Sequence, residues 1–220
     1  MERLNTKLGR FKAHLEALFV DHEILRLAYR NFYKLSNRAY RSNHPSPGFI
    51  KKLKEKHGLK TVISMRKANN TGQYLLEKEA CDKLQINLVH HPMSSRKLPD
   101  AQKIVDAKHL LESVEYPILI HCKSGADRAG LMSVLYKHFI EREPMEIAIK
   151  QLSIKYGHFR WADTGRLDFF FDNFFEYQKD HPNTDFLTWV TNIYDKPSLD
   201  SKFKSSGWAN IVVNKILNRE

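Results

Sequence analysis

The middle of the chain alternates between short apolar runs and longer stretches in which apolar residues recur at helical spacing. The short runs contain many β-branched residues, so they predict strands, and the longer stretches predict helices between them. The predicted strands are residues 39–43, 59–65, 86–93 and 117–122, and the predicted helices are residues 46–58, 72–85 and 99–114. This alternation predicts an α/β fold with a central, mainly parallel sheet flanked by helices.

The two ends of the chain have a helical pattern and predict extra helices beside this core. The pattern continues over residues 129–143, 144–158 and 164–180, and the phenylalanine-rich last stretch is expected to be buried, with a lipid-facing or partner-facing surface as the alternative. Residues 11–33 predict an amphipathic helix that covers one face of the domain or else lies on a membrane surface. The expected division is an N-terminal helical extension (1–37), a core (38–160) and a C-terminal helical extension packed on the core (161–220).

Composition narrows the class of protein and of partner. The 220 residues are 42% apolar, which is enough for one substantial core. The formal charge of +11 attracts polyanions such as an anionic membrane surface or a phosphorylated substrate, whereas no interleaved basic and aromatic motif predicts nucleic-acid binding. No stretch approaches the roughly 20 apolar residues of a membrane-spanning helix. We expect a cytoplasmic protein, with peripheral contact at a membrane as an alternative.

The stretch ILIHCKSGADRAG, residues 118–130, indicates where the chemistry lies. It predicts a buried strand, a tight loop and the start of a helix, and the amide groups of such a loop converge on an anion. Two cysteines are too few for a disulfide framework, so the loop cysteine, Cys122, invites a chemical role. The amides would stabilise a thiolate at Cys122, and Arg128 could hold two phosphoryl oxygens with its planar guanidinium. The predicted substrate-binding residues are Lys123, Ser124, Gly125, Ala126, Asp127 and Arg128.

The loop resembles the HCxxGxxR signature of the cysteine-based protein tyrosine phosphatase superfamily, in its compact dual-specificity branch. Residues 39–47, AYRSNHPSP, also look like the YRSxQPSP segment of bacterial members. The resemblance implies a phosphatase that uses Cys122 as nucleophile and Arg128 to bind phosphate, through a cysteinyl-phosphate intermediate. It also implies that neither a metal nor a cofactor is needed.

Two aspartates are candidates for the general acid that protonates the leaving group. Members of the superfamily usually supply an aspartate from a mobile loop, and the corresponding residues 90–100 contain only Asp100, which also suits a helix N-cap. Asp127 lies inside the CxxGxDR pattern, which is similar to that of the myotubularin lipid phosphatases. Asp127 ranks slightly ahead of Asp100, and its alternative role is to orient Arg128.

Two further positions bear on turnover and substrate. Ala129 stands where many relatives have a serine or threonine that helps the thiolate to leave, so slow breakdown of the intermediate is expected. The alternative function is therefore a catalytically impaired phosphate-binding module. The substrate is a phosphoprotein or an anionic lipid, inositol or glycolipid phosphate, and Lys123 with the basic composition slightly favours the second group.

Overall fold

The computed structural model describes residues 4, 6–16 and 30–205, and the chain divides into two compact units. The first unit comprises Met1–Pro92 and Val114–Gly125, and the second comprises Met93–Ser113 and Ala126–Glu220. The chain passes from the first unit to the second between Gly125 and Ala126, inside the candidate loop of residues 122–128. The boundaries expected at residues 37 and 160 stay a prediction.

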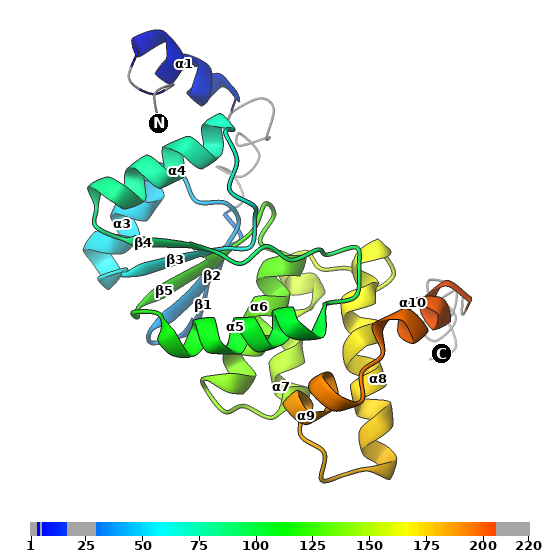
Figure 1. The fold of residues 1–220 in the computed structure, drawn as a ribbon. Helices are drawn as coiled ribbons and strands as arrows, with labels where there is room; N and C mark the ends of the chain where they lie inside the picture. Colours follow the sequence, from blue (N-terminus) through cyan, green and yellow to red (C-terminus); the bar gives the residue numbers. More distant parts are fainter. Residues whose placement is uncertain (1–3, 5, 17–29, 206–220) are drawn as a thin grey trace. The chain divides into compact units, whose positions relative to one another are not determined.

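The first unit contains a five-stranded sheet (Figure 1). Its strands are β1 (Tyr33–Ser36), β2 (Ala39–Ser42), β3 (Thr61–Ser64), β4 (Asn87–His90) and β5 (Ile118–His121). The order is β1-β2-β5-β3-β4, with β1 antiparallel to β2 and the other neighbours parallel. The predicted α/β class with a mainly parallel sheet is confirmed, although β1 was not foreseen.

Strand β5 is the middle strand of the sheet, and it leads into the candidate loop. It pairs in parallel with β2 on one side and with β3 on the other, and all four of its residues are buried. A parallel strand that is buried on both faces needs apolar residues at successive positions, which is why residues 118–120 are Ile-Leu-Ile.

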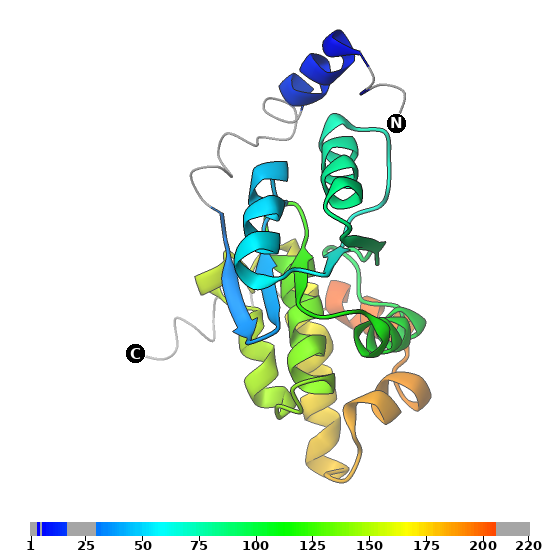
Figure 2. The ribbon, with the colours of Figure 1, turned by 90° about the vertical axis from the view of Figure 1, so that its left-hand side faces the viewer.

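Among the described residues of the first unit, three segments are helical: α1 (Lys7–Leu15), α3 (Pro47–His57) and α4 (Gly72–Lys83). Ser46 caps the start of α3, and Gly58 ends it with a left-handed φ of 63°, as its sequence pattern predicted. Figure 2 shows α3 and α4 next to each other. Their buried residues join the strands in a core that includes Tyr40, Phe49, Ile50, Leu53, Leu59, Val62, Ala80, Cys81, Ile86 and Leu119. Of the amphipathic helix expected over residues 11–33, residues 17–29 lie outside the described part.

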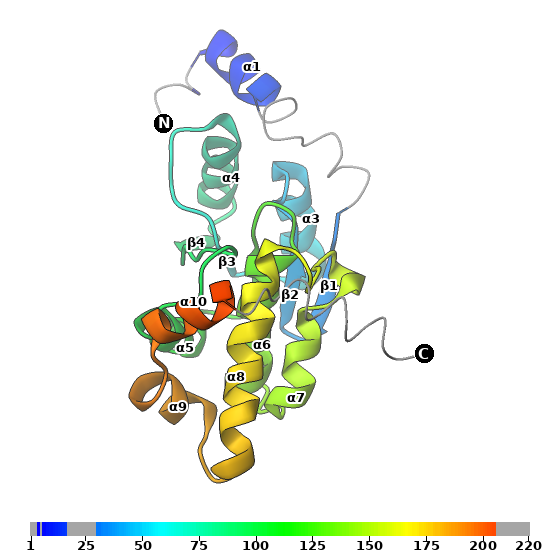
Figure 3. The same cartoon turned by 90° about the vertical axis from the view of Figure 1, so that its right-hand side faces the viewer.

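The second unit is helical. Its helices are α5 (Ala101–Ser113), α6 (Asp127–Phe139), α7 (Met145–Ala148), α8 (Arg166–Asp180), α9 (Phe186–Asn192) and α10 (Lys196–Ser205). Figure 3 shows α6 and α7 side by side. The expected helix over residues 144–158 is wrong in extent: after α7 the chain forms only single 3₁₀ turns, because Ser153 is extended and Gly157 has a φ of 76°.

Aromatic side chains form much of the core of the second unit. Phe170 of α8 lies with its ring centroid 5.4 Å from Trp189 of α9, and Phe174 lies 5.2 Å from Phe186. All four side chains are buried, which confirms the expected burial of the phenylalanine-rich stretch. Within the described residues, no helix combines the length and apolar character needed to cross a membrane.

Candidate active site

Three parallel strands end together where the candidate loop begins. Ser42 of β2 and Ser64 of β3 are both in register with His121 of β5. The main-chain N–H of Met65 also donates to the carbonyl of His121 at 2.8 Å. Cys122 therefore follows the middle strand at the carboxyl edge of the sheet, which is where parallel sheets bind ligands.

The carbonyl groups of the first half of the candidate loop are all held by donors of the first unit. His121 Nδ1 donates to the carbonyl oxygen of Cys122 (3.3 Å), and the main-chain N–H of His44 donates to that of Lys123 (3.3 Å). Asn31 Nδ2 donates to the carbonyl oxygen of Ser124 (2.9 Å), and Arg41 Nη2 donates to that of Gly125 (2.7 Å). Arg41, on β2, is completely buried. A buried arginine and three further donors thus fix the direction of four successive carbonyls.

This arrangement decides where the amide groups of the loop point. In a planar trans peptide the N–H lies opposite the C=O, so holding the carbonyls of Cys122, Lys123 and Ser124 directs the next three N–H groups to the other side. One of these, the N–H of Gly125, donates to Cys122 Sγ at 3.2 Å. The loop is thus an amide nest beside the sulfur, a geometry that stabilises a thiolate and a bound oxyanion.

Gly125 occupies a position that a residue with a side chain could not fill. Its φ is +80°, and a Cβ added there would lie 2.6 Å from the main-chain nitrogen of Asn43 and 2.8 Å from the carbonyl carbon of Ser42. Because these neighbours are main-chain atoms at the end of β2, they cannot rotate away. The close approach of the loop to β2 therefore requires glycine.

The structure separates the predicted site residues between the two units. Cys122, buried at 1% exposure, lies in the first unit with Gly125 and with the exposed Lys123 and Ser124. Ala126, Asp127 and Arg128 belong to the second unit, where α6 begins at Asp127. A carboxylate in the first turn of a helix is favoured by the helix dipole, so Asp127 also stabilises the start of α6.

Asp127 is joined to a buried histidine that the sequence did not single out. His158 Nδ1 lies 2.8 Å from Asp127 Oδ1, and its Nε2 lies 2.7 Å from Asp168 Oδ2. Since ionised carboxylates only accept hydrogen bonds, both ring nitrogens carry protons. Burial lowers the pKa of His158, but the hydrogen bonds to Asp127 and Asp168 outweigh it and raise that pKa to about 9. His158 is therefore a buried imidazolium between two carboxylates.

The buried His158 makes the free energy of unfolding fall as pH rises through the alkaline range. Because the pKa of His158 is about 9 when folded and 6.5 as its ordinary value, the stabilisation is complete below about pH 6.5 and is lost as pH rises through 9. We expect the free energy of unfolding from urea titrations to fall by on the order of 3 kcal/mol over this range. The His158→Gln variant should lose most of this dependence, and an unchanged slope in the variant would contradict the assignment.

Asp100, the second candidate acid, lies directly before α5 and is engaged within the second unit. Its carboxylate is 2.5 Å from Lys196 Nζ, and its side chain is 65% exposed. Nearby, the hydroxyl of Tyr194 donates to the carbonyl of Pro99 at 2.9 Å. The start of α10 and the residues before it thus hold the segment that carries Asp100.

In the described part of the chain, one buried group of side chains has the composition of a metal site. His44, Glu77 and His121 offer ligand atoms that all lie within 4.8 Å of one another. The hydrogen bonds of the two histidines determine whether their inward nitrogens can bind a cation.

Comparison with known proteins identifies the family of the chain. Residues 35–164, more than half of the chain, match the family model described as "DSP-PTPase phosphatase fused to NAD+ Kinase". The chain belongs to this family. Membership of the DSP-PTPase family confirms the resemblance to the compact dual-specificity branch.

The relatives of this DSP-PTPase support the same conclusion. Dual specificity protein phosphatase TpbA from two strains of Pseudomonas aeruginosa is 24% identical over 123 residues, which are 56% of this chain and 53% of the relative. The chain thus spans about half the length of the curated relatives it matches.

Solved structures show the same fold at low identity. The crystal structure of P. aeruginosa TpbA has a TM-score of 0.54 at 21% identity and covers 66% of this chain and 86% of its own. A TpbA variant in complex with pTyr has a TM-score of 0.51 at 21% identity, covering 63% and 80%. The Siw14 catalytic core has a TM-score of 0.50 at 19% identity, covering 70% and 92%.

The sequence of this DSP-PTPase did not identify several residues that lie against the candidate loop or close to it. Arg41 lies in the stretch AYRSNHPSP, but nothing in its local pattern shows that the guanidinium reaches Gly125. Glu77 gave a usable signal, because it stands three and four residues before the buried Ala80 and Cys81 on α4. A charged residue on the apolar face of a helix marks a position that needs a partner.

Proposed function

We propose that this chain hydrolyses phosphate monoesters through a cysteinyl-phosphate intermediate formed on Cys122. The observation that carries the proposal is the loop whose carbonyls are held away while the Gly125 amide donates to Cys122 Sγ at 3.2 Å. Arg128 follows six residues after Cys122, and in this proposal its guanidinium binds two oxygens of the phosphate. Lys123, Ser124, Gly125, Ala126 and Asp127 complete the loop around the anion.

The reaction has two steps. The Cys122 thiolate attacks phosphorus, the P–O bond to the leaving group breaks, and the departing oxygen takes a proton from a general acid. Water then attacks the cysteinyl-phosphate, gives its proton to the same carboxylate, and releases inorganic phosphate as the S–P bond returns its electrons to sulfur. Neither step needs a metal ion or a redox cofactor.

Asp127 is the proposed acid, and its contact with His158 supports the assignment. The proton on His158 Nδ1 faces Asp127 Oδ1 across 2.8 Å, so it can pass to the carboxylate when a leaving group demands it. Asp168 at the other nitrogen keeps the histidine in the orientation needed for this transfer. Asp100, the other candidate, contacts the ammonium group of Lys196 instead.

The identity of the acid can be read from the dependence of rate on the leaving group. For Asp127→Asn we expect kcat with phenyl phosphate to fall by about 100-fold or more, because phenolate needs a proton to depart. Dinitrophenyl phosphate, whose leaving group departs as the anion, should lose much less. The measurement is kcat for a series of aryl phosphates plotted against the pKa of the leaving phenol.

Asp100→Asn is the matched control for this series. It removes one carboxylate of the same type and should leave the dependence on the leaving group unchanged. If Asp100→Asn steepens the dependence and Asp127→Asn does not, Asp100 is the acid and Asp127 serves to orient the loop.

The intermediate itself tests the proposed function. After mixing with excess aryl phosphate in the presence of a chelator, acid-quenched protein should carry a phosphoryl group on the peptide that contains Cys122. Ala129 lacks the hydroxyl that would help the thiolate to leave, which favours accumulation of this adduct. Binding of tungstate without any product or adduct would instead support the catalytically impaired module.

The proposed substrates are phosphate monoesters in general and, among them, esters that carry a further anionic group. Any phosphate monoester that reaches the loop is a substrate in principle, and Lys123 on the exposed part of the loop favours one with a further anionic group. Rates with a phosphotyrosine peptide and with a phosphoinositide in vesicles compare the phosphoprotein and lipid classes directly. The complex of TpbA with pTyr supports including the first.

A further inference from the structure

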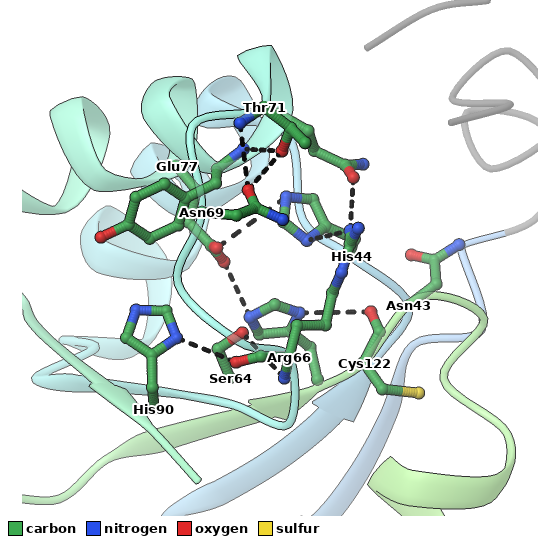
Figure 4. Close-up of polar contacts among 12 residues, drawn as sticks. Asn43, His44, Ser64, Arg66, Asn69, Thr71, Glu77, His90 and Cys122 are labelled. Carbon is green, nitrogen blue, oxygen red and sulfur yellow. Dashed lines mark hydrogen bonds and ion pairs between the residues drawn. The ribbon is translucent and has the colours of Figure 1, made fainter. Parts of the chain in front are cut away.

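A carboxylate lies buried beneath the start of the candidate loop. Glu77 of α4 is 1% exposed, and Figure 4 shows it pointing toward His44, while Arg66 and His90 lie around the same cluster. Its Oε1 is 2.7 Å from His121 Nε2, and its Oε2 is 3.9 Å from His44 Nε2. All of these residues belong to the first unit.

Two acceptor groups lie against the ring nitrogens of His121. Its Nε2 is 2.7 Å from Glu77 Oε1, and its Nδ1 faces the carbonyl oxygen of Cys122 at 3.3 Å. A carboxylate and a carbonyl both accept hydrogen bonds, so the ring lies between two acceptors. His121 is completely buried and adjacent in sequence to the proposed nucleophile.

The tautomer of His44 argues against a metal ion in this cluster. Arg66 Nη1 lies 3.3 Å from His44 Nδ1, and a guanidinium can only donate, so Nδ1 accepts. The proton of a neutral His44 is then on Nε2, which faces Glu77. A protonated nitrogen cannot bind a cation, so His44 presents an N–H toward the carboxylate instead of a lone pair to a metal.

Keeping a carboxylate at this depth is costly unless it is paired. Burial raises the pKa of Glu77, but the interactions with His121, and to a lesser extent with His44 and His90, outweigh it and lower that pKa to about 2. Ala80 and Cys81, on the same face of α4, are buried as well, so apolar side chains supply the packing of this helix. The buried charge is thus retained for what it holds rather than for the packing of the helix.

We propose that Glu77 is a positioning residue for the anion-binding loop, acting through His121 on the peptide between Cys122 and Lys123. The ring of His121 holds the carbonyl of Cys122, and the planar peptide then directs the N–H of Lys123 toward the anion. Without the carboxylate, His121 loses the acceptor at Nε2 that sets the orientation of its ring. The inference rests on the proposed function for its relevance to catalysis, but its geometry concerns anion binding alone.

Two measurements on the full chain test this role. The ¹⁵N shifts of the His121 ring in wild-type protein should report both nitrogens protonated at neutral pH, and in Glu77→Gln one nitrogen should be unprotonated. Tungstate affinity should fall about tenfold in Glu77→Gln, the loss of one well-directed hydrogen bond to an anion. Glu79→Gln, which removes a carboxylate two positions along the same helix, should leave both the His121 shifts and the tungstate affinity as in wild type.

Each result has a defined meaning. One unprotonated ring nitrogen on His121 in wild-type protein overturns the inference. This measurement is made on wild type, so it does not depend on whether the variant folds. A folded Glu77→Gln that binds tungstate as tightly as wild type also overturns it. If wild type binds tungstate and shows the expected His121 shifts but hydrolyses no ester, the proposed function fails while the role of Glu77 stands.

Discussion

Cys122→Ser is expected to lose at least about four orders of magnitude in kcat toward aryl phosphates, the size of loss seen when a catalytic nucleophile is removed. A serine hydroxyl at this position is a far weaker nucleophile than a thiolate beside an amide donor. The carbonyl contacts that shape the loop do not involve the sulfur, so tungstate should still bind with an affinity within about tenfold of wild type. Steady-state kinetics with a chelator present and calorimetric titration of tungstate measure the two quantities.

The chain provides its own control in its second cysteine. Cys81 lies in the core of the first unit, where burial and then the charge of Glu77 raise the pKa of its thiol to about 12. Cys81→Ala should therefore keep the wild-type kcat. Hydrolysis that survives in Cys122→Ser, or that disappears in Cys81→Ala with the fold intact, would rule out Cys122 as the nucleophile.

Gly125→Ala is the second change with a large expected effect. The new Cβ would meet the main-chain atoms of Asn43 and Ser42 at 2.6 and 2.8 Å, and the φ of +80° adds about 1–2 kcal/mol of strain for a residue with a side chain. The loop must move away from β2, and a shift of roughly 1 Å in a reacting group costs about 100-fold in rate. We expect kcat/KM and tungstate affinity both to fall by about that factor.

Substitutions at Gly58 and Gly48 separate the effect of a positive φ from the effect of the close contact with β2. Gly58→Ala carries a similar positive φ of 63° with open space around the new Cβ, so it should lose about 1–2 kcal/mol of stability and no activity. Gly48→Ala, with nothing within 4 Å and no positive φ, should change neither. If Gly125→Ala behaves like Gly58→Ala, the close approach to β2 has no part in shaping the loop.

The regular elements were predictable where local rules decide them. The strand at residues 118–121 and the helix between Ser46 and Gly58 follow from an apolar run and from capping residues, which act over a few positions. The edge strand β1 was missed because Tyr33–Ser36 is short and only one of its residues, Leu35, is buried. Its place in the sheet comes from pairing with β2, which no local pattern encodes.

In the candidate site too, the residues of a local motif could be predicted, and the residues that come from distant parts of the chain could not. Cys122, Gly125 and Arg128 were identified because a loop motif has fixed spacing within one segment. The groups that hold this segment come from distant parts of the chain: Arg41 is 84 positions away from Gly125, and Asn31 is 93 positions away from Ser124. A single sequence does not show such pairings, and the same holds for His158 beside Asp127.

The tethered carbonyls of the loop also bear on how the protein behaves in a solution rich in oxyanions. Because donors of the protein itself fix these carbonyls, little ordering is required when a ligand enters. Such a rigid receptor selects for tetrahedral shape and charge, properties that inorganic phosphate shares with every ester it comes from. If the chain hydrolyses phosphate esters as proposed, product inhibition is therefore expected, and turnover should depend on the ratio of ester to free phosphate rather than on ester concentration alone.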